Sequence, residues 1–223
     1  MIADISLVSV LAITGMVAAT LLIAALIGGR FFEIFRIWPS PPAKSLRSAA
    51  YWSLFRTLNV TVLVLAVVSV WADLETGAPS AMRIVLLSMS AASGLVYAYA
   101  LWALGRAATY CKASGLETRG IYEWSRNPQY ATAIVAYGFL AAGSSSLAVT
   151  GLAIALIAVY ALMALSEEPW LLARYGEAYA EYARRAPRFF PIRRSVALLM
   201  MGDIPPAENH RGRERERIDV SRR

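Results

Sequence analysis

Cysteine and histidine are almost absent from this chain of 223 residues, which contains one of each, Cys111 and His210. A single cysteine excludes an intramolecular disulfide, and neither a zinc site nor a haem attachment motif can be written. We therefore expect no metal centre. Histidine is also the usual proton-transfer group near neutral pH. His210 stands in a tail segment without an apolar face that could dock it, so we expect any such step to use another group.

Long polar stretches are scarce as well, because 58% of the residues are hydrophobic and most of them stand in extended blocks. This pattern indicates an integral membrane protein rather than a soluble core. The formal net charge of +7 could suggest nucleic acid, but the Lys and Arg residues fall in loops and in the tail, beside the apolar blocks. That is the positive-inside pattern, so we expect membrane lipids and no nucleic acid as partners.

Five apolar segments predict membrane helices, and they cover residues 5–28, 51–71, 81–104, 130–142 and 147–165. A span needs about 20 residues, so the fourth segment has to cross tilted or begin in the interface. Its connection to the fifth is short enough to force an antiparallel hairpin. The sequence thus predicts an all-α integral membrane protein with about five transmembrane helices, including a C-terminal helical hairpin.

The charge distribution predicts the topology of these helices. Basic residues load segments 30–56 and 105–127, whereas the loop with Asp73 and Glu75 is acidic. The basic loops and the C-terminus are therefore expected in the cytoplasm and the N-terminus outside, as in a bacterial inner-membrane protein. Asp4 stands ahead of the first apolar run, where a signal peptide has basic residues, so we expect this run to be retained as a helix.

An amphipathic pattern begins at Ser166, a plausible helix N-cap, and ends before Pro187. It predicts a helix that lies along the membrane surface, followed by basic and aromatic residues suited to anionic lipid. The tail lacks apolar periodicity and is expected to be disordered. Three regions result: N-terminal helices at 1–104, a core at 105–191 and a basic tail at 192–223.

The stretch from Gly120 to Tyr130 is polar, aromatic and rich in turns, although apolar segments flank it. Pro128 disfavours helix at the residue before it and suits the first turn of the next helix. The free N–H groups of that helix start, together with Arg126, suit a carboxylate or a phosphate. Glu167 and Glu168, beyond the fifth segment, are predicted to form the other half of this site.

Several short motifs carry a family resemblance over residues 102–191. They are Trp102 with Leu104-Gly105-Arg106, Gly120-Ile121-Tyr122, Arg126-Asn127-Pro128-Gln129-Tyr130, Glu167-Glu168, Leu171, Tyr175-Gly176, Tyr179, Tyr182, Pro187 and Pro191. Each piece alone is weak, but their order and spacing are fairly specific. This part of the chain resembles the isoprenylcysteine carboxyl methyltransferase family and its phospholipid methyltransferase relatives.

The resemblance implies a membrane methyltransferase that binds S-adenosyl-L-methionine on the cytoplasmic side and admits a lipophilic small-molecule acceptor from the bilayer. The acceptor could be an isoprenoid carboxylate, a phospholipid amine or a thiol. The implied cofactor-binding residues are Tyr122, Arg126, Asn127, Pro128, Tyr130, Glu167 and Glu168, and the candidate catalytic residues are Arg126, Glu167 and Glu168. The family's usual Arg-His-Pro is Arg126-Asn127-Pro128 here, so an imidazole is missing at this place. The acceptor could then be already anionic, could lose its proton to bulk water, or could lose it to Glu167 or Glu168 as the base.

Structural interpretations of the same residues remain open. Two glutamates suit the first turn of a helix capped by Ser166, Arg126 could be a positive-inside anchor, and Tyr122 and Tyr130 could belong to an interfacial aromatic belt. Two other function classes are also open: a membrane reductase that has a related helix bundle and uses NADPH, and a noncatalytic membrane adaptor.

Overall fold

A computed structural model describes residues 2–38, 42, 45–77, 79–109 and 115–190, so Cys111 and the predicted tail at 192–223 lie outside the described residues. Every regular element in the described part is a helix, which confirms the all-α class. The elements are α1 (Ile2–Gly28), η1 (Glu33–Phe35), α2 (Leu46–Thr76), α3 (Ala81–Thr109), η2 (Gly120–Glu123), α4 (Pro128–Gly143), α5 (Leu147–Tyr175) and α6 (Glu177–Arg185).

Four of the described helices, α1, α2, α3 and α5, are long and apolar enough to cross a membrane. The predicted fifth span, α4, has 16 residues and is therefore only about 24 Å long at 1.5 Å per residue, whereas the hydrocarbon core is about 30 Å thick. The sequence thus placed this helix correctly, but α4 is too short to count among the candidate membrane spans. The predicted hairpin is present as α4 and α5, joined by residues 144–146.

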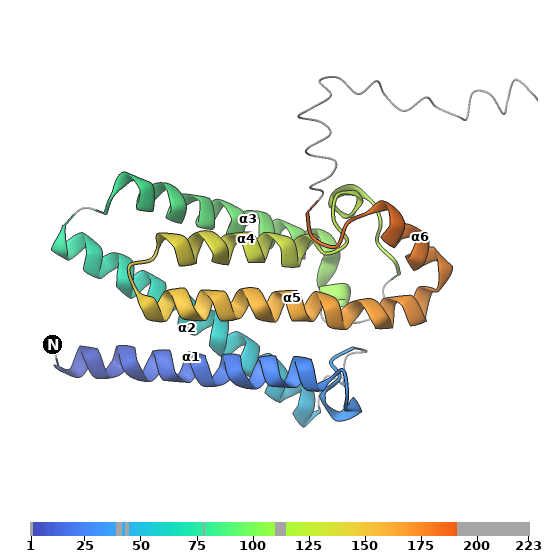
Figure 1. The fold of residues 1–223 in the computed structure, drawn as a ribbon, viewed down its shortest axis with the longest axis horizontal. Helices are drawn as coiled ribbons and strands as arrows, with labels where there is room; N and C mark the ends of the chain where they lie inside the picture. The colour runs from blue at the N-terminus through green and yellow to red at the C-terminus, as the bar shows by residue number, and fades with distance from the viewer. Residues whose placement is uncertain (1, 39–41, 43–44, 78, 110–114, 191–223) are drawn as a thin grey trace, which may run out of the picture. The chain divides into compact units, whose positions relative to one another are not determined.

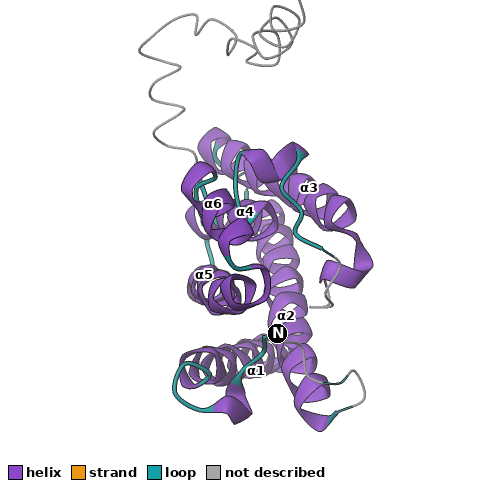
Figure 2. Ribbon diagram, turned by 90° about the vertical axis from the view of Figure 1, so that its right-hand side faces the viewer, coloured by secondary structure: helices purple, strands orange, loops and turns teal. Residues whose placement is uncertain are grey.

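Helix α5 is the centre of the bundle and packs against α1, α2, α4 and α6. Helix α4 lies beside α5 on one side and α3 on the other, and α1 lies on the opposite side of α5 (Figures 1 and 2). The inward face of α5 consists of small and branched apolar residues, and Leu152, Ala153, Leu156 and Val159 have no exposed surface. Their close packing fixes the hairpin against the N-terminal helices.

A cluster of polar side chains joins α2, α3, α4 and α5 inside the bundle. The Oδ1 atom of Asn59 in α2 accepts hydrogen bonds from Tyr137 Oη in α4 (2.7 Å) and Tyr160 Oη in α5 (3.1 Å), and the Tyr160 and Tyr97 hydroxyls are 3.3 Å apart. Hydrogen bonds of this kind hold membrane helices together, at about 0.6 kcal/mol each on average. Asn59 therefore has the helix-packing role that its position in an apolar segment indicates.

An ionic cluster closes the bundle at the ends of α2 and α4. Arg83 of α3 binds the Asp73 carboxylate of α2 through Nη2 and donates from Nε to the Gly143 carbonyl oxygen at 3.0 Å. The Ser145 hydroxyl donates to the same carboxylate at 2.9 Å. This cluster links α2, α3 and the hairpin connection.

Replacing Arg83 with alanine should lower the free energy of unfolding by about 2 kcal/mol, because hydrogen bonds to charged groups contribute about 1.5–3 kcal/mol and Asp73 keeps only Ser145 as a partner. Thermal unfolding of the purified protein in one detergent measures the change. Arg56→Ala is the matched control, since Arg56 is exposed on α2 and should change stability by less than about 0.5 kcal/mol. Equal stability of the two variants would contradict the prediction.

The structure corrects the predicted start of the amphipathic helix. Ser166 is not an N-cap: its hydroxyl donates to the Leu162 carbonyl within α5 at 2.7 Å, and α5 continues through Pro169 to Tyr175. Packing along α5 outweighs the single backbone hydrogen bond that a proline removes. The break comes at Gly176, whose φ of +54° disfavours residues with a side chain, and the separate helix α6 has only nine residues.

Candidate functional site

The loop before α4 is held in place by the chain that follows α6. The Arg126 N–H donates to the Pro187 carbonyl at 2.8 Å. Ser125 Oγ and Asn127 Nδ2 both donate to the Arg188 carbonyl at 3.2 Å. These bonds fix the backbone of residues 125–127 and leave the Arg126 side chain to be placed by its own contacts.

Tyrosines attach η2 to α6. Tyr182 Oη of α6 donates to the Tyr122 carbonyl at 2.8 Å, and Tyr122, Tyr179 and Tyr182 are buried together against Ala186. The apolar face of α6 is therefore covered by protein. The sequence predicted an amphipathic helix here, and the structure shows that its aromatic side chains face the η2 loop.

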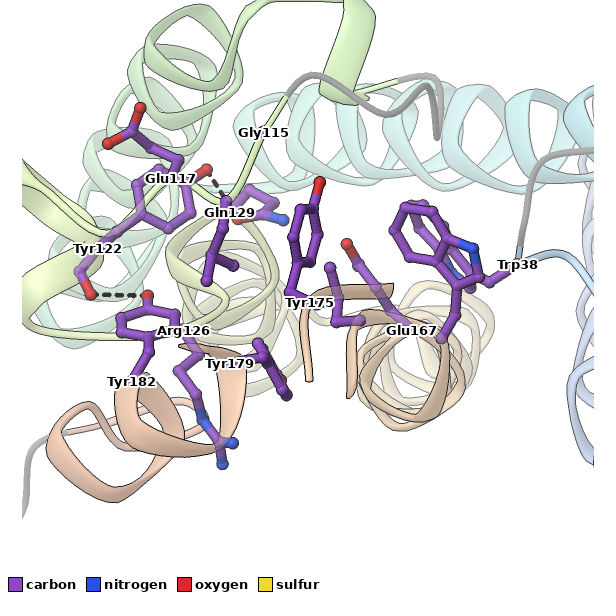
Figure 3. Close-up of a pocket in the computed structure, with 13 residues that line it drawn as sticks. Trp38, Gly115, Glu117, Tyr122, Arg126, Gln129, Glu167, Tyr175, Tyr179 and Tyr182 are labelled. Carbon is purple, nitrogen blue, oxygen red and sulfur yellow. Dashed lines mark hydrogen bonds between the residues drawn. The ribbon is translucent and has the colours of Figure 1, made fainter. Parts of the chain in front are cut away.

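A cavity of about 240 Å³, which we call the tyrosine cavity, opens between η2, α5 and α6 (Figure 3). Its lining combines aromatic, acidic and basic side chains from five segments of the chain, namely Trp38, Gly115, Leu116, Glu117, Tyr122, Arg126, Gln129, Glu167, Trp170, Leu171, Tyr175, Tyr179 and Tyr182. In Figure 3, Glu167 and Trp38 lie at one end of the cavity and Tyr122 and Glu117 at the other.

The two adjacent glutamates of α5 have different surroundings. Glu167 lines the tyrosine cavity, and its Oε2 accepts a hydrogen bond from Tyr130 Oη at 3.0 Å. Glu168 does not line the cavity. Arg188 binds both of its carboxylate oxygens, at 2.8 and 2.6 Å, and Arg126 Nη2 is 3.3 Å from Oε1.

The Glu168 cluster is largely shielded from solvent, with side-chain exposures of 15% for Glu168, 14% for Arg126 and 40% for Arg188. A two-point Arg–carboxylate pair in such surroundings is strong and directional. It ties the chain after α6 to α5 and at the same time orients Arg126. Glu168 therefore has a structural role in the site. Of the two adjacent glutamates, Glu167 is the one that lines the cavity.

Trp38 Nε1, in the wall of the tyrosine cavity, is buried without a hydrogen-bond partner. Arg126 Nε and Tyr179 Oη are buried in the same wall, where the Arg126 side chain interacts with the Tyr179 hydroxyl. Buried donors are nearly always paired, so the Trp38 N–H calls for an explanation, and a bound ligand is one. Burial raises the pKa of Tyr179 to about 12, and the nearby Glu168 carboxylate adds to this effect. The Tyr179 hydroxyl is therefore a neutral donor at pH 7.

The structure brings together some of the predicted site residues and gives others a supporting place. Tyr122, Arg126 and Glu167 line the cavity. Tyr130 does not line it but donates a hydrogen bond to Glu167. Asn127, which is 2% exposed, Pro128 and Glu168 do not line it. Asn127 stands at the N-cap of α4, and its side chain binds the Arg188 carbonyl instead.

The predicted anion site at the start of α4 is partly occupied by the protein itself. The Arg126 N–H is bound to the Pro187 carbonyl, and the Asn127 N–H is bound to Ser125 Oγ at 3.1 Å. These two donors are thus taken, because the loop folds back on the segment after α6. Arg126 is the basic residue of the cavity lining, and its guanidinium pairs with Glu168.

Sequence reasoning did not assign several of the lining residues to the site, and Gln129 and Trp38 show two different reasons for this. Gln129 is buried in the second position of α4, 3.5 Å from Tyr122 Oη, and it stands inside the Asn-Pro-Gln-Tyr motif, so a local signal was present. Trp38 comes from the segment after η1, far from the rest of the site in sequence. Only its packing on Trp170, with ring centroids 5.5 Å apart, reveals its place.

Glu117 also lines the cavity, but its carboxylate is engaged locally. Its Oε1 accepts from the N–H groups of Thr118 and Arg119, each at 3.1 Å. This arrangement shapes the turn that leads into η2. Glu167, by contrast, accepts its hydrogen bond from a side chain of the hairpin, Tyr130, rather than from the local backbone.

Comparison with known proteins matches the same region. The cobalt-zinc-cadmium resistance protein CzcN of Cupriavidus metallidurans (strain ATCC 43123 / DSM 2839 / NBRC 102507 / CH34) is 40% identical over 81 residues, which are 36% of this chain and 37% of CzcN. The chain thus matches little more than a third of that relative. Among the described residues, no three His, Cys, Asp or Glu side chains are grouped so as to hold a metal ion. No solved structure matches the chain.

A family model covers most of the helices that build the tyrosine cavity. It matches residues 82–178, from the start of α3 into α6, and its description is phospholipid methyltransferase. The match begins earlier and ends earlier than the motifs at 102–191, and it includes the η2 loop, Arg126 and both glutamates. Over these residues the chain matches the phospholipid methyltransferase family of integral membrane methyltransferases, which confirms the resemblance drawn from its motifs.

Proposed function

We propose that this protein transfers a methyl group from S-adenosyl-L-methionine to a lipophilic acceptor at the cytoplasmic face of the membrane. The observation that supports it most is the lining of the tyrosine cavity, which brings Arg126, Glu167 and several aromatic rings together. The family match adds the reaction class. The lining comes from η2, α6 and the last turns of α5, which lie at the end of the bundle where α1 also ends (Figure 1). The basic segments 30–56 and 105–127 adjoin these elements in the sequence, which supports the cytoplasmic side.

The lining fits the groups of this cofactor. The Arg126 guanidinium suits the methionine carboxylate, and Glu167 suits the ammonium group or the ribose hydroxyls. The aromatic rings of Tyr122, Tyr175 and Trp170 suit adenine or the cationic sulfonium. When bound, the cofactor supplies a methyl carbon that the sulfonium activates for displacement by an electron pair of the acceptor.

The protein's own contribution is placement, exclusion of water and, where the acceptor is protonated, removal of a proton. Placement within about 3–3.5 Å of the methyl carbon accounts for much of the catalysis of such a reaction. Asn127 cannot accept a proton, and its side chain is already bound to the Arg188 carbonyl. Glu167 is therefore the candidate base, held in position by the Tyr130 hydroxyl.

Calorimetric titration of the purified protein tests the proposal. S-adenosyl-L-methionine should bind to the wild-type protein at one site per chain, and NADPH should not. Arg126→Ala should weaken that binding at least tenfold, because a hydrogen bond to a charged group is worth at least about 1.5 kcal/mol. Arg119→Ala is the matched control: Arg119 is exposed and outside the cavity lining, so the affinity should stay the same.

The same titration separates the other function classes. Binding of NADPH without S-adenosyl-L-methionine would support the membrane reductase and overturn the methyltransferase. Binding of neither compound by the folded protein would support a noncatalytic adaptor.

A further inference from the structure

A second cavity of about 400 Å³, which we call the Arg30 cavity, adjoins the tyrosine cavity. It lies between the end of α1, the segment around η1 and the C-terminal part of α5. Trp38 and Trp170 line both cavities. Their rings, 5.5 Å apart and tilted by 32°, form a wall that the two cavities share.

Hydrogen bonds hold the chain segment between α1 and Trp38, which contributes Gly29, Arg30, Phe35 and Arg36 to the lining of the Arg30 cavity. The chain reverses after α1, where the N–H groups of Phe31 and Phe32 donate to the Gly28 carbonyl at 3.0 and 2.8 Å. Gly29 permits the close approach of the returning chain, because a Cβ there would lie 2.9 Å from the Phe35 carbonyl oxygen. Arg47 Nη1 then donates to the Glu33 and Ile34 carbonyls at 3.2 and 3.3 Å. These contacts fix the backbone around the Arg30 cavity.

The lining of the Arg30 cavity is apolar on one part and cationic on another. Leu26, Ile37 and Leu165 supply apolar surface, whereas Arg30 and Arg36 supply positive charge. Arg36 pairs at 3.2 Å with Glu33, whose side chain is 87% exposed. Exposed pairs of this kind are worth at most about 1 kcal/mol, so Arg36 can exchange this partner for an anion.

Helix geometry directs α5 toward both cavities. Ser166, Pro169 and Ala173 line the Arg30 cavity, and Glu167 and Leu171 line the tyrosine cavity. These two sets follow helical spacings of three and four residues and so form adjacent stripes on one helix. Trp170 lies between the stripes. A molecule in the Arg30 cavity is therefore one helix stripe away from Glu167.

An unpartnered donor lies in the shared wall. Trp38 is 7% exposed, and its indole N–H has no hydrogen-bond partner. A buried N–H group without a partner is costly in an apolar wall. Together with the two arginines, it indicates that the Arg30 cavity takes a ligand with hydrogen-bond acceptors as well as an apolar part.

We propose that the Arg30 cavity is the acceptor site and that it binds an amphiphile with an anionic head group, a carboxylate or a phosphate, between Arg30 and Arg36. The apolar chain of the acceptor lies along Leu26, Ile37 and Leu165, and its polar part reaches the wall at Trp38. The name acceptor rests on the proposed function. Binding of the amphiphile does not, because it follows from the lining alone.

Photo-crosslinking in nanodiscs tests the binding directly, with a diazirine derivative of palmitic acid as the probe. After illumination, peptide mapping should find the probe on residues of the Arg30 cavity, in the segments 26–38 and 165–173. Excess hexadecyl phosphate should compete, whereas hexadecyltrimethylammonium should not. Inorganic phosphate should not compete either, and equal competition by it would show that the site takes a free anion and overturn the amphiphile.

Variants show whether the labelling uses the proposed groups. Arg30→Gln combined with Arg36→Gln should reduce labelling at least tenfold, and Trp38→Phe, which keeps the aromatic packing, should reduce it severalfold. Arg174→Gln is the matched control, since Arg174 is an exposed arginine of the same α5 segment that lines neither cavity. Labelling that is equal in all variants would overturn the assignment.

Titration with S-adenosyl-L-methionine on the same preparations separates the two proposals. If the cofactor binds but the probe does not label the cavity, the acceptor site is wrong and the proposed function stands. If the probe labels the cavity but the cofactor does not bind, amphiphile binding is supported and the methyltransferase is overturned.

Discussion

Replacing Glu168 with alanine should lower the free energy of unfolding by about 3 kcal/mol. The change leaves Arg126 and Arg188 largely shielded and without their shared carboxylate. Breaking a buried ion pair costs about 3–5 kcal/mol, and the partial exposure of Arg188 puts this cluster at the low end. Thermal or denaturant unfolding in detergent measures the loss.

Glu181→Ala is the control for this prediction. Glu181 also pairs with an arginine, Arg185, at 3.6 Å, but both side chains are more than half exposed. An exposed pair contributes at most about 1 kcal/mol, so this variant should stay close to the wild type. If Glu168→Ala were as stable as Glu181→Ala, the cluster would not hold the segment after α6.

Replacing Glu167 with glutamine should weaken S-adenosyl-L-methionine binding by about 10- to 100-fold, which corresponds to the roughly 1.5–3 kcal/mol of a hydrogen bond to a charged group. Glutamine keeps the size of the side chain and an acceptor for Tyr130, but it removes the ionisable carboxyl group from the tyrosine cavity. Calorimetry on the purified variant measures the affinity, and its unfolding temperature should remain near that of the wild type.

Tyr130→Phe tests the hydrogen bond from Tyr130 to Glu167 separately from the carboxyl group itself. This change removes the 3.0 Å hydrogen bond to Glu167 but leaves the carboxylate in the cavity, so the affinity should fall less than in Glu167→Gln. Equal affinity of Glu167→Gln and wild type would mean that Glu167 does not contact the cofactor.

The helices could be predicted from the sequence because each apolar block is long, weakly charged and bounded by turn residues. The prediction failed at Ser166, where a change from uniform to amphipathic pattern suggested a new helix. In the structure, the backbone of α5 remains helical up to Tyr175. The pattern changes because the last part of α5 packs against protein on one side only. A pattern change thus reported a change of surroundings rather than a helix end.

The candidate site could be predicted only where a local motif carries it. Arg126, Tyr122 and Glu167 were found from motif order, and they do meet in one cavity. The sequence does not distinguish Glu167 from Glu168, because adjacent helical residues differ by about 100° in direction and only the neighbouring arginines show which one is engaged. Trp38 carries no local signal, since its place depends on tertiary packing against Trp170.

The hydrogen bonds from residues 125–127 to Pro187 and Arg188 have a consequence for the order of assembly during synthesis. Ser125 and Arg188 are 63 residues apart in the chain, and Tyr122 and Tyr182 are 60 apart. The η2 loop therefore emerges long before the partners that fix it, and α4, α5 and α6 have to be made first. About 60 residues of chain have to be brought together at their ends before these contacts form, and closing so long a segment is slow. The tyrosine cavity should therefore be completed late, after the membrane helices have been inserted.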